Sequence, residues 1–215
     1  MNVDPYIAVL VAGFAVSLIV AAALNAGVVR VPASIPLRGL RGGNGKAPPL
    51  GGIALLAGFA VAPFLAAAVS DRATEYFIPK RTEFFGFLGA TGLVFLTGVI
   101  DDWRAMRPWQ KLSGQTIAGV AVFAGGALDL GVLALPATLL WVLFFTNALN
   151  LVDGKDGLAT GVGVFAAAAL AAVAANTHHP AVALLFVGLA GAGLGFLPFN
   201  LPSATLYLGD AGALS

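Results

Sequence analysis

Long apolar segments alternate with short polar connectors along almost the whole chain of 215 residues. A helix that spans a bilayer needs about 20 mostly apolar residues, within a range of roughly 17–25. On this criterion the pattern predicts an all-α fold, a polytopic membrane helix bundle with seven complete spans plus the start of an eighth near Ala211. The seven spans cover residues 5–28, 51–70, 84–100, 112–128, 132–150, 158–175 and 181–197. Residues 1–215 would then form a single integral membrane domain.

Positive charges are divided unevenly between the two sets of connectors. Seven spans place alternate connectors on opposite sides of the membrane, and one set carries eight of the 11 basic residues. These eight are Arg30, Arg38, Arg41, Lys46, Arg104, Arg107, Lys111 and Lys155. Because cytoplasmic connectors are enriched in Lys and Arg, we predict a multi-pass protein of the cell (plasma) membrane whose N-terminus lies outside. The first apolar segment has no basic region before it, so we interpret it as a retained span.

The composition supports a protein of the lipid bilayer and excludes several other classes. Of the residues, 59% are hydrophobic and 10% are charged, whereas a soluble domain has about 25% charged residues. The chain contains no cysteine, which excludes disulfides and thiolate metal sites. Its net charge of +1 argues against a nucleic acid partner.

Five aspartates lie at the ends of predicted spans, all on the side assigned to the cytoplasm: Asp101, Asp102, Asp153, Asp156 and Asp210. Ionisable groups at membrane depth are costly and usually line a cavity or a functional site. We therefore predict that carboxylates from three connectors converge on one face. In the adjacent pair Asp101 and Asp102, a divalent cation would relieve the mutual repulsion, and Mg²⁺ prefers such oxygen ligands. A solvated loop at a charged helix end explains this pair equally well.

Residues 147–157 read NALNLVDGKDG and carry a polar side chain at every third position. Side chains at i and i+3 are neighbours on a helix, so Asn147, Asn150, Asp153 and Asp156 could wrap around a bound headgroup. Gly154 would let the backbone approach a ligand closely. Interhelical hydrogen bonds of the two asparagines are the alternative, but they leave the two carboxylates unexplained.

Two further segments each have two readings. Asp210 lies between glycines just before the last predicted helix, where it could be a metal ligand or an N-cap. The basic segment that contains Arg38, Arg41 and Lys46 could be a phosphate-facing loop or an orientation signal near lipid headgroups.

Taken together, these stretches resemble the polyprenyl-phosphate N-acetylhexosamine-1-phosphate transferase family (glycosyltransferase family 4), which includes UDP-GlcNAc:undecaprenyl-phosphate GlcNAc-1-phosphate transferases. The resemblance runs from about residue 30 to the end and is most specific in NALNLVDGKDGLA and LYLGDAG. The matching stretches follow the family's order and cover residues 48–52, 98–115, 147–157 and 199–212.

The resemblance implies a Mg²⁺-dependent reaction, with Mn²⁺ as a substitute. A UDP-amino sugar would donate GlcNAc-1-phosphate, or a related hexosamine phosphate, to polyprenyl (undecaprenyl) phosphate and release UMP. This step would initiate cell-wall or surface polysaccharide synthesis. Either direct attack by the lipid phosphate or a covalent aspartyl intermediate fits the residues.

The resemblance also implies roles for individual residues. Asp101, Asp102 and Asp153 would be catalytic, and Asp210 and Asp101 would hold the metal. The predicted substrate-binding residues are Lys46, Lys111, Asn147, Asn150, Gly154, Asp156, Asn200 and Tyr207. A homodimer is compatible with the resemblance.

The branch of the family and the length of the chain leave alternatives. The spacing from Asp102 to Lys111 favours the UDP-GlcNAc branch, with phospho-N-acetylmuramoyl-pentapeptide transferase as the alternative. Ala213 stands where a serine is common, and family members continue through more helices and a His-x-His motif, so we expect the chain to be C-terminally incomplete. From other classes, a transporter or channel subunit and an inactive scaffold are the alternatives.

Overall fold

The computed structural model describes residues 3–27, 48–104, 106–124 and 131–214, and these residues form helices and no strand. In chain order the elements are α1 (Pro5–Asn25), α2 (Gly51–Val69), α3 (Asp71–Phe77), the 3₁₀ turn η2 (Ile78–Lys80), α4 (Arg81–Trp103), α5 (Pro108–Ala124), the 3₁₀ turn η3 (Gly131–Leu133), α6 (Ala134–Val152), α7 (Leu158–Asn176), α8 (Pro180–Asn200) and α9 (Gly209–Leu214).

The predicted all-α membrane bundle is confirmed, although the number of spans differs in detail. Within the described residues, six helical segments are long and apolar enough to cross a bilayer. The predicted span at 112–128 corresponds to α5, whose described part has 17 residues and is not among those six. The predicted eighth helix is α9, which begins at Gly209.

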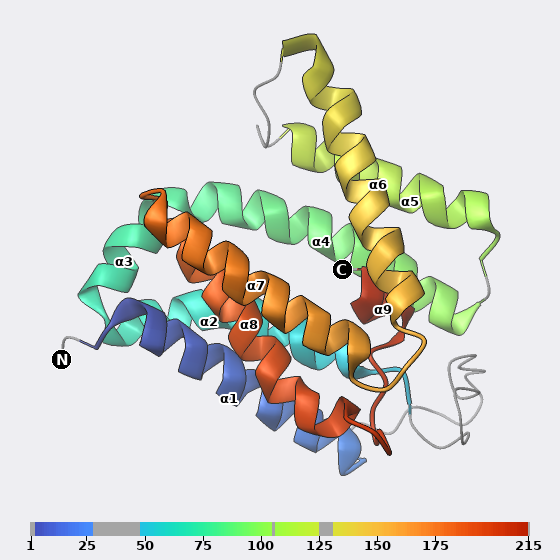
Figure 1. Cartoon of the computed structure of the whole chain (residues 1–215), viewed down its shortest axis with the longest axis horizontal. Coiled ribbons are helices and arrows are strands. Elements are labelled where there is room, and N and C mark those ends of the chain that lie inside the picture. Colours follow the sequence, from blue (N-terminus) through green and yellow to red (C-terminus); the bar gives the residue numbers. More distant parts are fainter. Residues whose placement is uncertain (1–2, 28–47, 105, 125–130, 215) are drawn as a thin grey trace.

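The connectors alternate between the two ends of the bundle, because α1, α2, α4, α7 and α8 all run roughly along its long axis (Figure 1). The ends of α1, α4, α6 and α8 and the starts of α2 and α7 meet at one end, which we call the loop end. Helix α3 and the connector between α7 and α8 lie at the opposite end. For these connectors the division is the one that the seven-span pattern predicts, whereas the start of α6 stands apart from α3, at the top of the view (Figure 1). Which side of the membrane the loop end faces remains a prediction from the charge distribution.

Helices α1, α2 and α8 form the most tightly packed part of the bundle, and glycines permit their close approach. A Cβ atom on Gly13 of α1 would lie 2.6 Å from the carbonyl oxygen of Gly188 in α8. A Cβ on Gly191 would meet the carbonyl oxygen of Leu10, and one on Gly58 of α2 would lie 2.8 Å from the Cβ of Ala192. Small residues at helix crossings let backbones approach in this way in membrane proteins.

The short helix α9 is wedged between α2 and α4 at the loop end. The N–H groups of Gly51 and Gly52, which begin α2, donate to the carbonyl oxygens of Tyr207 (2.9 Å) and Leu208 (3.0 Å). Gly52 also lies against Gly212, so close that a Cβ on Gly52 would be 2.6 Å from the Gly212 nitrogen. The start of α2 is thereby fixed to the segment that leads into α9.

We predict that Gly191→Ala destabilises the protein by about 1–3 kcal/mol, because the added methyl group must displace the backbone of α1. Thermal unfolding in detergent measures the effect as a lower midpoint. Gly163→Ala in α7 is the matched control, since its Cβ would enter open space and alanine favours a helix by up to about 1 kcal/mol. Equal midpoints for both variants would contradict the packing argument.

Candidate active site

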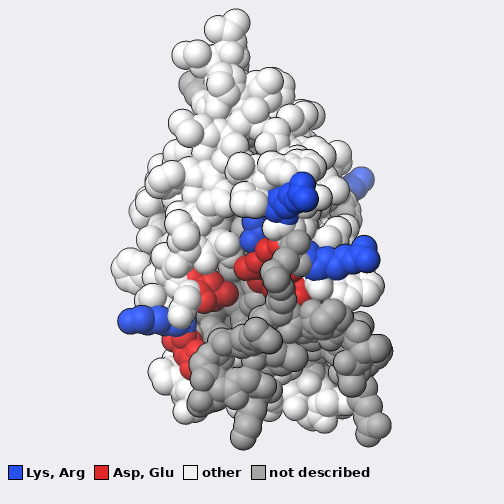
Figure 2. Space-filling model, turned by 90° about the vertical axis from the view of Figure 1, so that its right-hand side faces the viewer, with Lys and Arg blue, Asp and Glu red and all other residues white. Residues whose placement is uncertain are grey.

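Acidic and basic side chains gather at the loop end of the molecule, as the view onto this end shows (Figure 2). They surround a cavity of about 350 Å³ that is formed by the connectors between α6 and α7 and between α8 and α9, together with the ends of α4 and α8. Its lining residues are Pro49, Asp102, Asp153, Gly154, Lys155, Asp156, Asn200, Tyr207, Gly209 and Asp210. Carboxylates from the three predicted connectors therefore do converge on one cavity.

Lys111, near the start of α5, lies between two of these carboxylates. Its Nζ is 2.7 Å from Oδ2 of Asp101 and 2.8 Å from Oδ2 of Asp210. The side chain of Lys111 is 17% exposed, so these ion pairs are partly shielded from water. Asp101 also accepts a hydrogen bond of 2.6 Å from the N–H of Met106, which fixes its carboxylate at the end of α4.

Asp102 points to a different partner from its neighbour Asp101. Its Oδ1 accepts the N–H of Asp210 at 3.0 Å, and its Oδ2 accepts the N–H of Ala211 at 3.1 Å. Helix α9 begins one residue earlier, at Gly209, so both N–H groups belong to the first turn, where no intrahelical acceptor exists. Asp102 therefore caps the start of α9. The alternative prediction had assigned this capping role to Asp210.

Asp153 follows the last residue of α6 and lines the cavity. In the described part of the chain no hydrogen-bond donor contacts its carboxylate. Burial, together with the negative charges of Asp210 and Asp102, raises the pKa of Asp153 from its ordinary value of 3.8 to about 7. Burial also raises the pKa of Asp210, although the ammonium of Lys111 acts in the opposite direction. Counting only the residues that the structure describes, the cavity and its rim thus carry more carboxylates than cations.

The far side of the cavity is held by hydrogen bonds between α7, α8 and the loop that follows α8. Asn200 is 2% exposed; its Oδ1 accepts the hydroxyl of Thr160 (2.8 Å) and its Nδ2 donates to the carbonyl of Leu206 (3.2 Å). Oδ2 of Asp156 accepts the N–H of Ala204 at 3.3 Å. These bonds shape the wall on which Gly154 and Tyr207 also lie.

Asn147 and Asn150 do not line the cavity. The Nδ2 of Asn147 donates to Oε1 of Gln115 (2.8 Å) and to the carbonyl of Leu143 (2.8 Å), so this residue forms the interhelical hydrogen bond of the alternative reading. Gln115 is fully buried in that contact. The substrate-binding role of Asn147 and Asn150 stays a prediction. Lys46 lies outside the described residues.

Lys155 and Pro49 line the cavity; both lie in stretches that match the family, 147–157 and 48–52, but neither was among the predicted site residues. Lys155 stands inside the DGKDG stretch, but it was used only as an orientation signal. Pro49 is brought to the cavity by the backbone pairing of its segment with residues 207–208, since the N–H of Tyr207 donates to the carbonyl of Pro48. No periodicity in the sequence announces such a contact.

The donor set fits a hard divalent cation by its chemistry. The acidic residues that line the cavity are all aspartates. Mg²⁺ prefers oxygen ligands and is usually bound by one or two carboxylates together with substrate phosphates. Among the residues that the structure describes, no group of three or more His, Cys, Asp or Glu side chains is arranged to hold a metal by itself. Asp101 and Asp210 share Lys111 instead.

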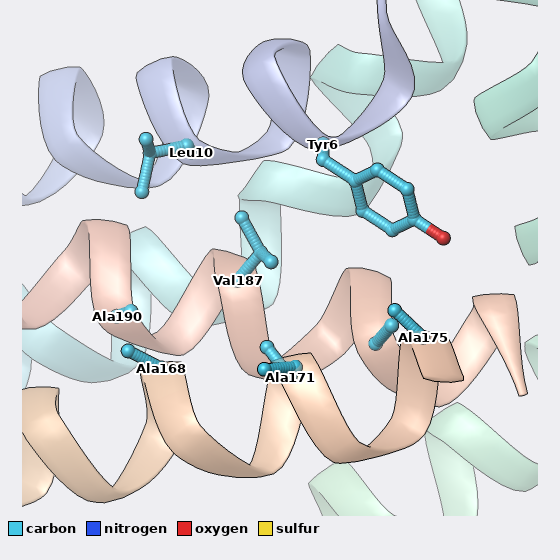
Figure 3. A pocket seen from close by; sticks show the side chains of 9 residues that line it. Tyr6, Leu10, Ala168, Ala171, Ala175, Val187 and Ala190 are labelled. Carbon is cyan, nitrogen blue, oxygen red and sulfur yellow. The ribbon is translucent and has the colours of Figure 1, made fainter. Parts of the chain in front are cut away.

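A second cavity, of about 360 Å³, has a different character (Figure 3). It lies between α1, α7 and α8 and holds no carboxylate or cation. Its lining consists of Tyr6, Leu10, Ala168, Ala171, Ala172, Ala175, Ala183, Val187 and Ala190. With one hydroxyl and no charge, it offers no catalytic groups, and the charged cavity is the candidate active site.

Comparison with known proteins assigns relatives to the chain. A model described as "Glycosyl transferase family 4" matches residues 84–215. A phospho-N-acetylmuramoyl-pentapeptide-transferase of Heliobacterium modesticaldum is 32% identical over 210 residues, which cover 85% of this chain and 62% of the relative. A decaprenyl-phosphate N-acetylglucosaminephosphotransferase of Mycolicibacterium smegmatis is 34% identical over 192 residues, which cover 78% and 46%. The chain thus spans less than two thirds of the length of these relatives.

The raised pKa of Asp153 predicts a stability that depends on pH. Between about pH 4 and 7 the folded protein binds the Asp153 proton and the unfolded chain does not, so stability falls as the pH rises through this window. We predict that Asp153→Asn raises the free energy of unfolding at pH 8 by about 1–2 kcal/mol over the wild type, and so raises the unfolding midpoint. At pH 4 the variant and the wild type should unfold alike. Thermal unfolding in detergent with a metal chelator measures this.

Asp71→Asn is the control for the loss of one carboxylate, because Asp71 is exposed at the opposite end of the molecule. If Asp153→Asn and Asp71→Asn gave the same difference from the wild type at both pH values, Asp153 would not carry the uncompensated charge.

Proposed function

The chain belongs to glycosyl transferase family 4. We propose that it forms the active site of a membrane enzyme that transfers a hexosamine 1-phosphate from a UDP-linked sugar to a polyprenyl phosphate and releases UMP. The observation that carries this proposal is the arrangement of Asp101, Lys111 and Asp210 beside a cavity whose wall includes Asp153. Three separate connectors supply these groups at one end of an apolar bundle, where a lipid-linked phosphate and a water-soluble nucleotide can meet.

The reaction joins two phosphate groups and needs no nucleophile from the protein. An oxygen of the polyprenyl phosphate attacks the sugar-bearing phosphorus of the UDP-sugar and forms a new P–O–P bond. The bond from that phosphorus to the bridging oxygen breaks, and UMP leaves with this oxygen. Phosphoryl transfer of this kind depends mainly on positioning and on neutralising charge, which fits a site built from carboxylates and lysines.

The residues divide this work according to their surroundings. Asp153 has a pKa of about 7, which suits a group that removes a remaining proton from the lipid phosphate near neutral pH. Asp101 and Asp210 would hold Mg²⁺, or Mn²⁺ in its place, and this cation would neutralise the diphosphate charge. Lys155, which lines the cavity, and Lys111, which pairs with Asp101 and Asp210, would contact the phosphates.

The donor sugar is a hexosamine, and the relatives' names cover both branches, N-acetylglucosamine phosphate and phospho-N-acetylmuramoyl-pentapeptide. The spacing from Asp102 to Lys111 supports N-acetylglucosamine. The positive-inside pattern supports an active site at the cytoplasmic face of the plasma membrane.

A transporter is a weaker alternative. Transporters usually bind their ions near the bilayer midplane, at broken helices. Here the carboxylates of the cavity lie at the loop end, beyond the ends of α6 and α8.

The decisive test is exchange of label between UMP and candidate UDP-sugars, in the complete protein with polyprenyl phosphate and Mg²⁺. We expect exchange only when the lipid phosphate and the divalent cation are both present. Asp101→Asn and Asp210→Asn should each lower the rate on the order of 10²–10³-fold, because each removes a charge that the diphosphate transition state requires.

UDP-GlcNAc and UDP-MurNAc-pentapeptide are compared as donors, with Asp71→Asn as the control for protein quality. A folded preparation with normal thermal unfolding but no exchange from either donor would sink the proposal. Exchange from the pentapeptide donor alone would assign the chain to the other branch.

A further inference from the structure

The two adjacent acids at the end of α4 have different tasks. Asp101 pairs with Lys111, whereas both oxygens of Asp102 accept backbone N–H groups of α9. Asp102 is 9% exposed, so water competes little for these bonds. From this geometry we propose that Asp102 is a positioning residue: it fixes the start of α9 and so places the carboxylate of Asp210.

One face of α4 is built to receive α9. Val94, Gly98 and Asp102 follow each other at four-residue intervals and therefore lie on the same side of the helix. Val94 packs with Leu214 in a buried cluster, and the backbone of Gly98 lies directly against Ala211. Asp102 completes this row by binding the N–H groups of Asp210 and Ala211. The first turn of α9 therefore rests on this row of α4.

The turn before α9 is fitted to the carboxylate of Asp102. Gly209 has a φ of 74°, a conformation that favours glycine. A Cβ at this position would lie 2.9 Å from Oδ2 of Asp102 and 2.8 Å from the carbonyl oxygen of Pro49. The chain therefore passes close over Asp102 and then presents its next two N–H groups to it.

The consequence for the reaction rests on the proposed function. Asp210 Oδ2 meets Lys111 at 2.8 Å only while its backbone stays where Asp102 holds it. Asp102 then acts through Asp210 and does not itself take the proton from the lipid phosphate. Loss of the cap should loosen α9, whereas loss of Asp101 should leave α9 in place.

Amide hydrogen exchange tests the structural part without substrates. In the complete protein we expect the N–H groups of Asp210 and Ala211 to exchange on the order of 10-fold faster in Asp102→Ala, because a bond to a charged acceptor protects them. Asp102→Asn, which keeps one acceptor oxygen, should lie between Ala and the wild type. Asp101→Asn is the matched control and should leave both amides protected. Unchanged protection in Asp102→Ala would overturn the proposal.

The activity assay tests the functional part by a double-mutant cycle. If Asp102 acts through Asp210, the variant that combines Asp102→Asn with Asp210→Asn should be no slower than Asp210→Asn alone. Asp102→Asn should also retain more activity than Asp102→Ala, and the acidic limb of its pH profile should remain. Asp102 would instead be the base if the rate losses of the two single variants multiplied in the double variant. The same would follow if Asp102→Asn and Asp102→Ala were equally inactive and the acidic limb of the pH–rate profile were lost. A protein without transferase activity leaves the exchange result standing, so the two failures are distinguishable.

Discussion

Lys111 is held between a carboxylate from α4 and a carboxylate from α9, and this ion-paired trio joins parts of the chain that are otherwise remote. The rest of the site depends on it, because burying several carboxylates at the end of an apolar bundle is costly without a compensating cation. α5 brings the ammonium, α4 brings Asp101, and the short α9 brings Asp210. The bundle and its close glycine contacts serve to hold these three helices in register.

Among the described residues, the carboxylates at the cavity outnumber the cations, and this imbalance affects which ligands the cavity can bind. Among the described residues Asp153 has no ion-pair partner, and burial together with the charges of Asp210 and Asp102 raises its pKa. A site in this state favours a ligand that arrives with positive charge, or a proton, over one that arrives as a bare anion. In the proposed reaction the nucleotide and the lipid phosphate would therefore arrive together with a cation.

Much of the architecture could be predicted because it follows from length and alternation. Spans of about 20 apolar residues must reverse direction at each connector, so acids in alternate connectors were bound to share one end. The details of side-chain pairing follow no such rule. The hydrogen bond of Asn147 to Gln115 joins α6 to the preceding helix α5 across 32 positions, and no sequence period specifies that partner. Asp101 and Asp102 look equivalent in sequence, but adjacent positions on a helix point in different directions. Their partners could not be predicted, because they depend on how α5 and α9 pack against the end of α4.

The ion pairs of Lys111 also decide which ions the site admits. Sodium or potassium would offer Asp101 and Asp210 the same single charge that the tethered ammonium already supplies, and would lose part of its hydration shell in doing so. Such an ion gains little by entering, however abundant it is. Wherever the net field of these groups is negative, a doubly charged ion gains about twice the attraction of a singly charged one, so under the proposed function the site would favour divalent over monovalent cations.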